Sequence, residues 1–224
     1  MRKEFIKRLL SSLILLPIAL FFTLKGSVFF IFFLCIIFFV TSFEWLKMSK
    51  KLKKFKFFGI CFLFLSFFLA YLLRNKQGFE TFLFIILISI LTDLGGYFFG
   101  KIFKGPKLIK ISPNKTYSGA IGSFIVSLIG GLIYLEYIPE TLLSSYLDGY
   151  ENIIEYNLFT LIFILTISLI SQIGDLIISY FKRLAKIKNT GNILPGHGGL
   201  LDRIDGIVFA IPFAYIYLKL TIIY

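Results

Sequence analysis

Long apolar stretches, separated by short basic or polar segments, are the feature that most constrains this sequence. Hydrophobic residues make up 58% of the 224 residues, and 29 residues are phenylalanine. In a soluble protein of this length the apolar share is roughly half. A run of about 20 apolar residues is long enough to cross the hydrocarbon core of a bilayer as a helix. The chain is therefore predicted to be an integral membrane protein.

We expect an all-α fold with about seven transmembrane helices, forming a single polytopic domain over residues 1–224. The predicted spans are residues 9–24, 28–43, 57–73, 79–99, 120–135, 158–180 and 207–224. The first run is not interpreted as a signal peptide, because no small-x-small cleavage site follows it. Within the domain, N-terminal helices (residues 1–78) precede the helices and loops that carry the motifs (residues 79–224).

The basic residues gather between the apolar runs. The net charge is +12, and 20 of the 24 Lys and Arg residues fall in four segments, residues 1–8, 46–56, 100–118 and 181–206. By the positive-inside rule, these segments and the N-terminus face the cytoplasm, and the acidic loop around Asp148 faces outward. Lysines confined to such loops do not indicate a nucleic-acid partner. The lysines of residues 47–56 could also bind anionic headgroups, and Trp45 is expected to anchor the helix end at the interface.

The most polar stretch runs from residue 179 to residue 205. It carries lysines, arginines and the single histidine, His197, within a turn rich in glycine and proline. Glycines let a backbone approach a ligand closely, and the cations suit an anion. Asp202 and Asp205, three residues apart, are suitable oxygen ligands for a divalent cation. This combination indicates a magnesium nucleotide or another phosphorylated substrate. The alternative, a solvated loop that serves only topology, does not require the glycine turn or the aspartates.

A second group of polar residues surrounds the fourth apolar run. Asp93 lies inside that run, where a carboxylate is costly unless it faces a polar site, so it is a functional candidate; helix–helix pairing is the alternative. The lysine-rich loop that follows contains the segment Ser-Pro-Asn-Lys-Thr at residues 112–116. The hydroxyls, the amide and the ammonium group of this segment could bind a phosphate or a ribose.

These residues resemble the motifs of the phosphatidate cytidylyltransferase (CDP-diacylglycerol synthase) family. The matching positions are Asp93, Gly100, Lys101, Ser112, Pro113, Asn114, Lys115, Thr116, Gly119, Asp175, Ser179, Lys182, Arg183, Lys188, Gly191, Pro195, His197, Gly198, Gly199, Asp202, Arg203 and Asp205. The chain departs from the family pattern at two positions. Asn189 replaces an aspartate, and Ser118 replaces a residue that is commonly glutamate.

The resemblance implies a membrane enzyme that transfers a cytidylyl group from CTP to phosphatidate and releases pyrophosphate. Asp175, Asp202 and Asp205 would bind Mg²⁺, and a second cation stays open. The implied catalytic residues are Asp175, Lys182, Arg183, His197, Asp202 and Arg203, although His197 could equally lock the turn. The implied substrate-binding residues are Asp93, Lys101, Ser112, Asn114, Lys115, Thr116, Ser179, Lys188, Gly198 and Gly199.

The expected location is the inner (plasma) membrane of a bacterium, with the site facing the cytoplasm and the bilayer as the surrounding partner. A homodimer stays open. Three other functions also remain: a related CTP-dependent lipid-alcohol kinase, a small transporter that uses the intramembrane aspartates, and an inactive paralogue that has lost the carboxylates at residues 118 and 189.

Overall fold

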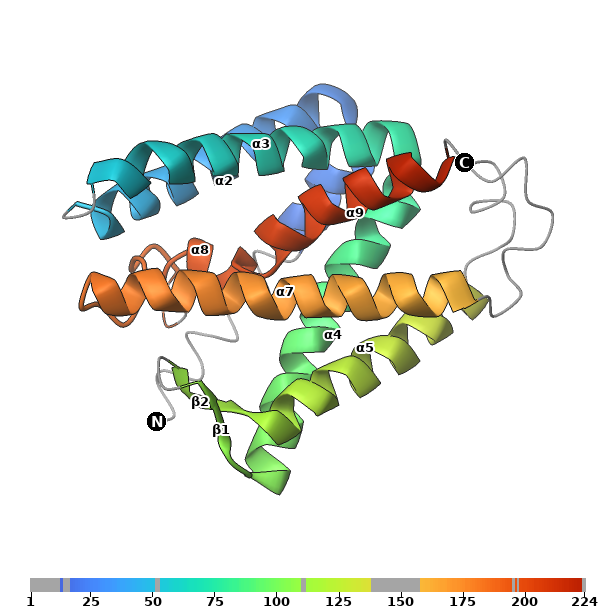
Figure 1. Ribbon diagram of the computed structural model, residues 1–224. Helices are drawn as coiled ribbons and strands as arrows, with labels where there is room; N and C mark the ends of the chain where they lie inside the picture. The colour runs from blue at the N-terminus through green and yellow to red at the C-terminus, as the bar shows by residue number, and fades with distance from the viewer. Residues whose placement is uncertain are drawn as a thin grey trace.

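The computed structural model describes residues 13, 17–50, 53–109, 112–137, 158–194, 196 and 198–222. The described chain is mostly helical (Figure 1). Its labelled helices are α2 (Ser27–Met48), α3 (Lys53–Gln77), α4 (Phe79–Phe103), α5 (Tyr117–Tyr137), α7 (Leu158–Leu184), α8 (Leu201–Ile204) and α9 (Ile207–Ile222). Residues 17–25 are also helical, whereas most of the rest of the first predicted span lies outside the described residues.

Five described helices are long and apolar enough to cross a membrane: α2, α3 from Lys54, α4, α5 to Glu136, and α7. The apolar part of α9, Ile207–Leu220, is shorter. Each of these helices coincides with a predicted span. The described chain therefore has five helices that could span a membrane, as the sequence predicted for these segments, while the count of seven spans and their orientation remain predictions.

Small residues allow α4 and α5 to pack closely. A Cβ atom on Gly95 would lie 2.5 Å from the carbonyl oxygen of Gly122, and one on Gly119 would lie 2.7 Å from the carbonyl oxygen of Gly96. Membrane helices commonly associate through such small residues because their backbones can then approach. This contact fixes the two helices on either side of the loop that carries the Ser-Pro-Asn-Lys-Thr segment.

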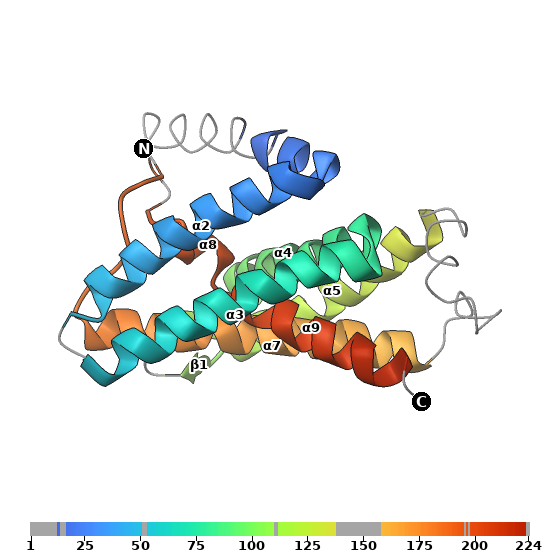
Figure 2. The ribbon, with the colours of Figure 1, turned by 90° about the horizontal axis from the view of Figure 1, so that it is seen from above.

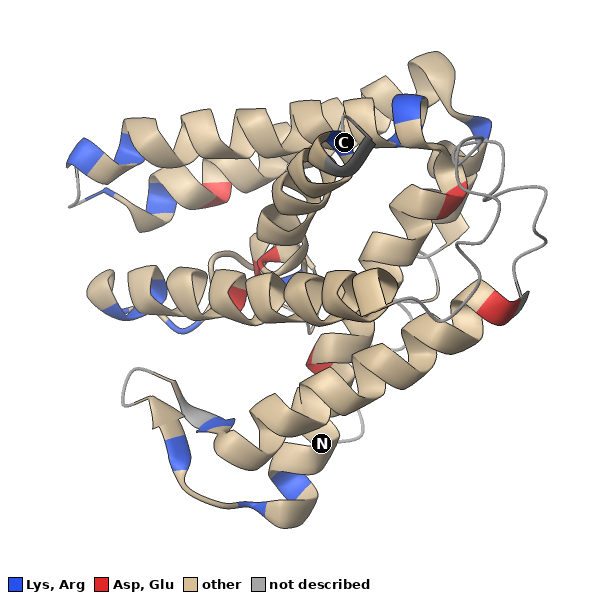
Figure 3. Cartoon of the chain, turned by 45° about the vertical axis from the view of Figure 1, so that its right-hand side comes forward, with Lys and Arg blue, Asp and Glu red and all other residues tan. Residues whose placement is uncertain are grey.

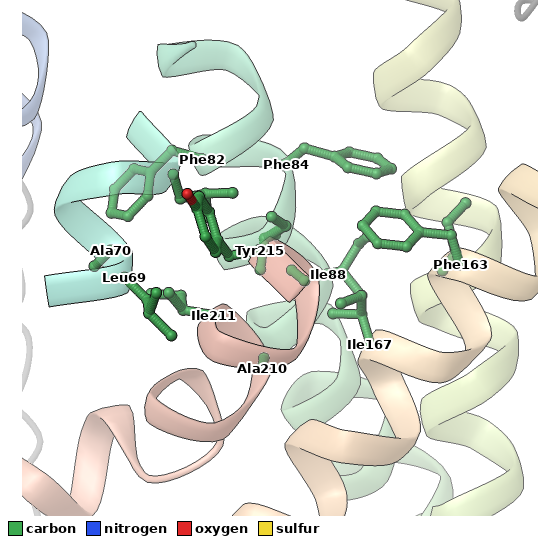
Figure 4. Packing of buried hydrophobic residues seen from close by; sticks show 14 of the residues in the cluster. Leu69, Ala70, Phe82, Phe84, Ile88, Phe163, Ile167, Ala210, Ile211 and Tyr215 are labelled. Atoms are coloured by element: carbon green, nitrogen blue, oxygen red, sulfur yellow. The ribbon is translucent and has the colours of Figure 1, made fainter. Parts of the chain in front are cut away.

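The main apolar core joins α3, α4, α7 and α9. Figure 4 shows Phe82 and Phe84 of α4 facing residues of the other helices, among them Phe163 of α7 and Tyr215 of α9. Ile85, Ile88, Ile164 and Ile167 at the same core are completely buried. The helices therefore form one interlocked bundle in which α7 contacts α4, α5 and α9.

Pro212 interrupts the hydrogen bonding of α9, and α3 compensates for it. Proline has no N–H, so the carbonyl of Val208, four residues earlier, loses its helical donor. The hydroxyl of buried Ser66 in α3 donates to this carbonyl oxygen over 2.7 Å. This bond also attaches α9 to α3.

A two-stranded antiparallel sheet follows α4, where the sequence was interpreted as a loop. Strand β1 (Lys107–Ile109) pairs with β2 (Ser112–Thr116), with Lys107 opposite Thr116 and Ile109 opposite Ser112. Pro113 does not prevent this pairing, because proline is tolerated on an edge strand. The strand β2 leads directly into α5 and places Lys115 beside α7.

A second, smaller core lies where α2, α3, α7 and α8 meet, and it corrects the prediction for Trp45. The Trp45 side chain is buried, its ring lies 5.0 Å from that of Phe181, and its indole N–H points to the carbonyls of Phe55 and Lys56. Trp45 is thus a core residue and not an interface anchor. The short α8 lies beside α2 in this region (Figure 2).

Candidate active site

Asp202 is the centre of a hydrogen-bonded loop between α7 and α9. One carboxylate oxygen accepts a hydrogen bond from Lys182 Nζ at 2.8 Å, within a largely buried ion pair. The other accepts from the backbone N–H of Thr190 at 2.8 Å and of Gly199 at 3.1 Å, and lies 3.1 Å from the Thr190 hydroxyl. These bonds hold residues 182, 190, 199 and 202 together, so Lys182 of the Lys-Arg segment and Asp202 of the Asp-Arg-x-Asp segment are in contact.

The glycine turn within this loop also forms as expected. Leu194 and Gly198 exchange two backbone hydrogen bonds, at 2.9 and 3.1 Å. Gly198 has φ of 93°, a conformation that favours glycine. His197 and Pro195 lie outside the described residues, so the roles predicted for His197 remain predictions.

Sequence reasoning missed one residue that contacts this loop from α2. Glu44 of α2 is 1% exposed, and its two carboxylate oxygens accept hydrogen bonds at 2.9 Å from the backbone N–H groups of Leu200 and Leu201. The Thr190 hydroxyl lies 2.9 Å from one of the same oxygens. The available sequence signal was its isolation, because Glu44 is the only acidic residue between positions 5 and 79.

A polar cavity of about 210 Å³ lies among α4, β2, α5 and α7. Its lining includes Asp93, Lys115, Thr116, Gln172 and Asp175. Lys115 Nζ forms an ion pair with Asp175 at 2.5 Å, which joins β2 to α7. The two predicted motif regions, remote in sequence, therefore meet at this cavity. Asp93 faces a polar site, as its position inside an apolar helix indicated.

Asp205 connects the cavity to the loop. It is 6% exposed, and burial, followed by the neighbouring Asp175 carboxylate, raises its pKa well above the usual value for aspartate. Its carboxylate accepts a hydrogen bond from the Gly206 N–H at 3.0 Å, while Ser179 donates to Asp175 at 3.2 Å. Lys182 interacts electrostatically with Asp205. The hydrogen-bonded group of Asp202, Lys182, Thr190 and Gly199, called the Asp202 hub below, therefore lies near the same carboxylates.

The three predicted metal ligands have different surroundings. Asp175 and Asp205 lie side by side, whereas both oxygens of Asp202 are taken by Lys182 and by loop donors. Within the part of the chain that the structure describes, no three His, Cys, Asp or Glu side chains are grouped to hold a metal ion. Lys115 and Ser179 contact the two oxygens of Asp175 in turn, so of the three residues Asp175 and Asp205 form the adjacent carboxylate pair, while Asp202 organises the loop.

Most of the remaining predicted residues are exposed. Arg183, Lys188 and Arg203 are exposed, and Arg203 is close enough to interact electrostatically with Asp93. Lys101 lies over the Tyr97 ring, at 5.6 Å from its centroid. Ser112 is partly exposed on β2, and the Asn114 side chain lies outside the described residues.

The two departures from the family motifs occupy defined positions. The Ser118 hydroxyl donates to the carbonyl oxygen of Lys104 at 2.8 Å and lies 3.0 Å from the Thr116 hydroxyl. Asn189 is exposed beside Gly198, where a Cβ would lie 3.2 Å from Asn189 Cγ and 3.1 Å from an Asp202 oxygen. Serine therefore closes the β hairpin, and Asn189 lies close to the Asp202 hub.

Comparison with known proteins agrees with this geometry. A phosphatidate cytidylyltransferase of Brucella suis is 38% identical over 149 residues, which are 65% of this chain and 50% of the relative. Those of Staphylococcus saprophyticus (38% over 139 residues; 62% and 48%) and Staphylococcus haemolyticus (39% over 146 residues; 65% and 51%) are similar to the same degree. The chain spans about half the length of the curated relatives it matches. The model of the cytidylyltransferase family matches residues 49–221, which include both motif regions. On this evidence the chain is a member of the cytidylyltransferase family.

Proposed function

We propose that this protein transfers a cytidylyl group from CTP to phosphatidate, giving CDP-diacylglycerol and pyrophosphate. Family membership supports the nucleotide, and the names of the relatives support the lipid acceptor. The observation that carries the proposal is the polar cavity lined by Lys115 and Asp175, beside which Asp205 and the Lys182–Asp202 ion pair lie. Such a cavity can hold two phosphorylated groups together.

The reaction requires positioning and charge neutralisation more than covalent catalysis. An oxygen of the phosphatidate phosphate attacks the α-phosphorus of CTP, and the bond from that phosphorus to the β-phosphate oxygen breaks as pyrophosphate leaves. Lys182, Arg183 and Arg203 would hold the triphosphate and stabilise the charge that develops on the leaving group. Lys115 and Thr116, next to Asp93, would orient the second phosphate.

Mg²⁺ fits the residues at this site. Two adjacent carboxylates, Asp175 and Asp205, repel each other when both are charged, and a hard divalent cation between them would relieve that repulsion. Asp175 and Asp205 would hold such a cation, whose positive charge would offset the negative charge of the phosphate oxygens. Ser179 would orient Asp175 through the hydrogen bond described above.

We further propose that the site faces the cytoplasm, where CTP is available, with seven spans in the inner (plasma) membrane of a bacterium. The four basic segments support this orientation. The C-terminal ends of α2 and α7 lie toward the same end of the bundle as the β hairpin (Figure 1). A homodimer remains an untested part of the proposal.

The test uses the purified chain in detergent with phosphatidate, a long-chain lipid alcohol, Mg²⁺ and CTP labelled at either the α- or the γ-phosphate. We expect lipid to gain label from α-labelled CTP alone. Label from γ-labelled CTP would instead identify a lipid kinase, and no label from either would indicate an inactive paralogue. The Asp175→Asn variant serves as the inactive control.

A further inference from the structure

We propose that Glu44, on a helix outside the segment matched by the family model, is a positioning residue for the reaction proposed above. It holds the loop that carries Asp202, which pairs with Lys182 of α7, and it acts on the reaction through these residues. The inference rests on the proposed function only where lipid labelling is used to measure activity. Its structural part concerns the loop alone.

Glu44 is fully buried, and the described contacts give it no basic partner. A buried carboxylate is stable only when hydrogen bonds replace its lost hydration. Both of its oxygens are used in this way, by the backbone N–H groups of Leu200 and Leu201, each at 2.9 Å. These amides directly precede Asp202. The carboxylate therefore fixes the backbone from which Asp202 projects.

Thr190 connects Glu44 to Asp202. Thr190 is 2% exposed. Its hydroxyl lies 2.9 Å from a Glu44 oxygen and 3.1 Å from an Asp202 oxygen. A hydroxyl has one proton, so it can donate to one of the two carboxylates at a time. Because the Thr190 N–H also donates to Asp202, a continuous chain of contacts runs from α2 through Thr190 and Asp202 to Lys182 on α7.

Two glycines of the loop are explained by the same contact. A Cβ on Gly191 would lie 2.6 Å from a Glu44 oxygen. A Cβ on Gly199 would lie 2.5 Å from the other Glu44 oxygen and 2.1 Å from the Thr190 hydroxyl. Any side chain at these positions would therefore displace the Glu44 carboxylate or the loop. The glycines of the motif serve the approach of α2 and not only the approach of a ligand.

The test compares two threonine variants that each remove one buried hydroxyl. Thr190→Val breaks the link to Glu44, whereas Thr41→Val removes a hydroxyl of α2 that bonds only within its own helix, to the carbonyls of Ile37 and Phe38. We expect Thr190→Val to lower the rate of lipid labelling about tenfold to a hundredfold. Thr41→Val should keep the wild-type rate at a similar melting temperature, and Thr190→Ser should restore most of the activity.

Amide hydrogen exchange of the same detergent-solubilised chain tests the loop without turnover. In Glu44→Gln, one carboxylate oxygen becomes an NH₂ group that cannot accept, so the amides of Leu200 and Leu201 should exchange about tenfold faster. They should be unchanged in Thr41→Val. Exchange is informative even if the wild-type chain labels no lipid, so failure of the proposed function and failure of the positioning role are distinguishable.

Two results would overturn the inference. One is unchanged exchange at Leu200 and Leu201 in folded Glu44→Gln. The other is a Thr190→Val enzyme that labels lipid at the wild-type rate, since the contact chain would then have no consequence for the reaction. If Glu44→Gln fails to fold, lipid labelling by the Thr190 variants alone tests the positioning role.

Discussion

At the scale of single residues, Asp202 accepts hydrogen bonds from Lys182, Thr190 and Gly199, and its replacement gives the first prediction. Asp202→Asn keeps the size of the side chain but loses one acceptor oxygen, which leaves either Lys182 or the loop amides unpaired. We expect lipid labelling to fall at least about a hundredfold, or roughly 2.7 kcal/mol of barrier. Asp175→Asn should have the same effect through loss of the Lys115 ion pair and of a carboxylate for Mg²⁺.

Both variants are measured by CTP-dependent lipid labelling, and size-exclusion chromatography in detergent checks that they remain folded. Glu136→Gln is the matched control, because Glu136 is an exposed carboxylate at the end of α5. A wild-type rate of lipid labelling by Asp202→Asn, at the magnesium concentration used for the wild type, would contradict a role for Asp202 in the active site.

Asn189 gives the second prediction. It lies beside Gly198 and near Asp202, so an aspartate there would add a carboxylate to the edge of the site. Under the proposed function, Asp175 and Asp205 would offer a carboxylate pair for one Mg²⁺ without a carboxylate at position 189. We therefore expect the natural chain to be active, and Asn189→Asp to leave the rate unchanged or raise it by up to about a hundredfold.

The measurement is lipid labelling by both forms across a magnesium titration. Asn192→Asp, at another exposed position of the same loop, controls for added negative charge. An inactive natural chain that becomes strongly active through Asn189→Asp would show that the carboxylate is essential.

Residue types predicted a polar site within residues 179–205, because lysines, arginines, glycines and aspartates gather in this one short stretch. Glu44 could not be predicted in the same way. It is 146 residues from Thr190 in the sequence, and only the packing of α2 against α8 brings the two together. The division of Asp175, Asp202 and Asp205 into a carboxylate pair and a separate hub likewise depends on tertiary contacts.

At the scale of elements, the helices were predictable because apolar length alone determines them in a membrane. The β hairpin was not, since three- and five-residue strands in a lysine-rich segment with Pro113 have no distinct pattern. Its consequence is functional, because β2 positions Lys115 against Asp175. The bond between α3 and α9 at Pro212 was equally invisible in the sequence.

That bond gives the third prediction. Ser66→Ala should leave the Val208 carbonyl buried without a donor and destabilise the protein by about 1–3 kcal/mol. With Pro212→Ala added, a backbone N–H becomes available to the same carbonyl, so the loss caused by Ser66→Ala should largely disappear. Thermal unfolding in detergent of the wild type, both single variants and the double variant measures this coupling.

Ser89→Ala is the matched control, because the buried Ser89 hydroxyl donates to Ile85, within its own helix. Ser89→Ala should lower the free energy of unfolding by less than Ser66→Ala does. Equal effects of Ser66→Ala with and without Pro212 would show that the hydroxyl does not replace the missing helical bond.

At the scale of the whole molecule, charge and architecture point to the same end of the bundle. Figure 3 shows Lys and Arg at the junction of α2 and α3, at the end of α7 and around the β hairpin. The Asp202 hub and the cavity at Asp175 involve the last part of α7 and the strand β2. Orientation in the membrane therefore decides whether the site can reach cytoplasmic CTP.

The fourth prediction tests that orientation with single cysteines placed at Lys104, Asn192 and Asp148. Cys35 and Cys61 are both exposed in the described structure, so they are first replaced by alanine. Lys104 and Asn192 are exposed at the two motif loops, and Asp148 is in the acidic loop, outside the described residues. Because basic loops are retained in the cytoplasm, an impermeant thiol reagent applied to intact cells should label only the Asp148 position. All three should react after the membrane is permeabilised. Labelling of Asn192 in intact cells would reverse the topology, and a site that faced outward would have no access to cytoplasmic CTP.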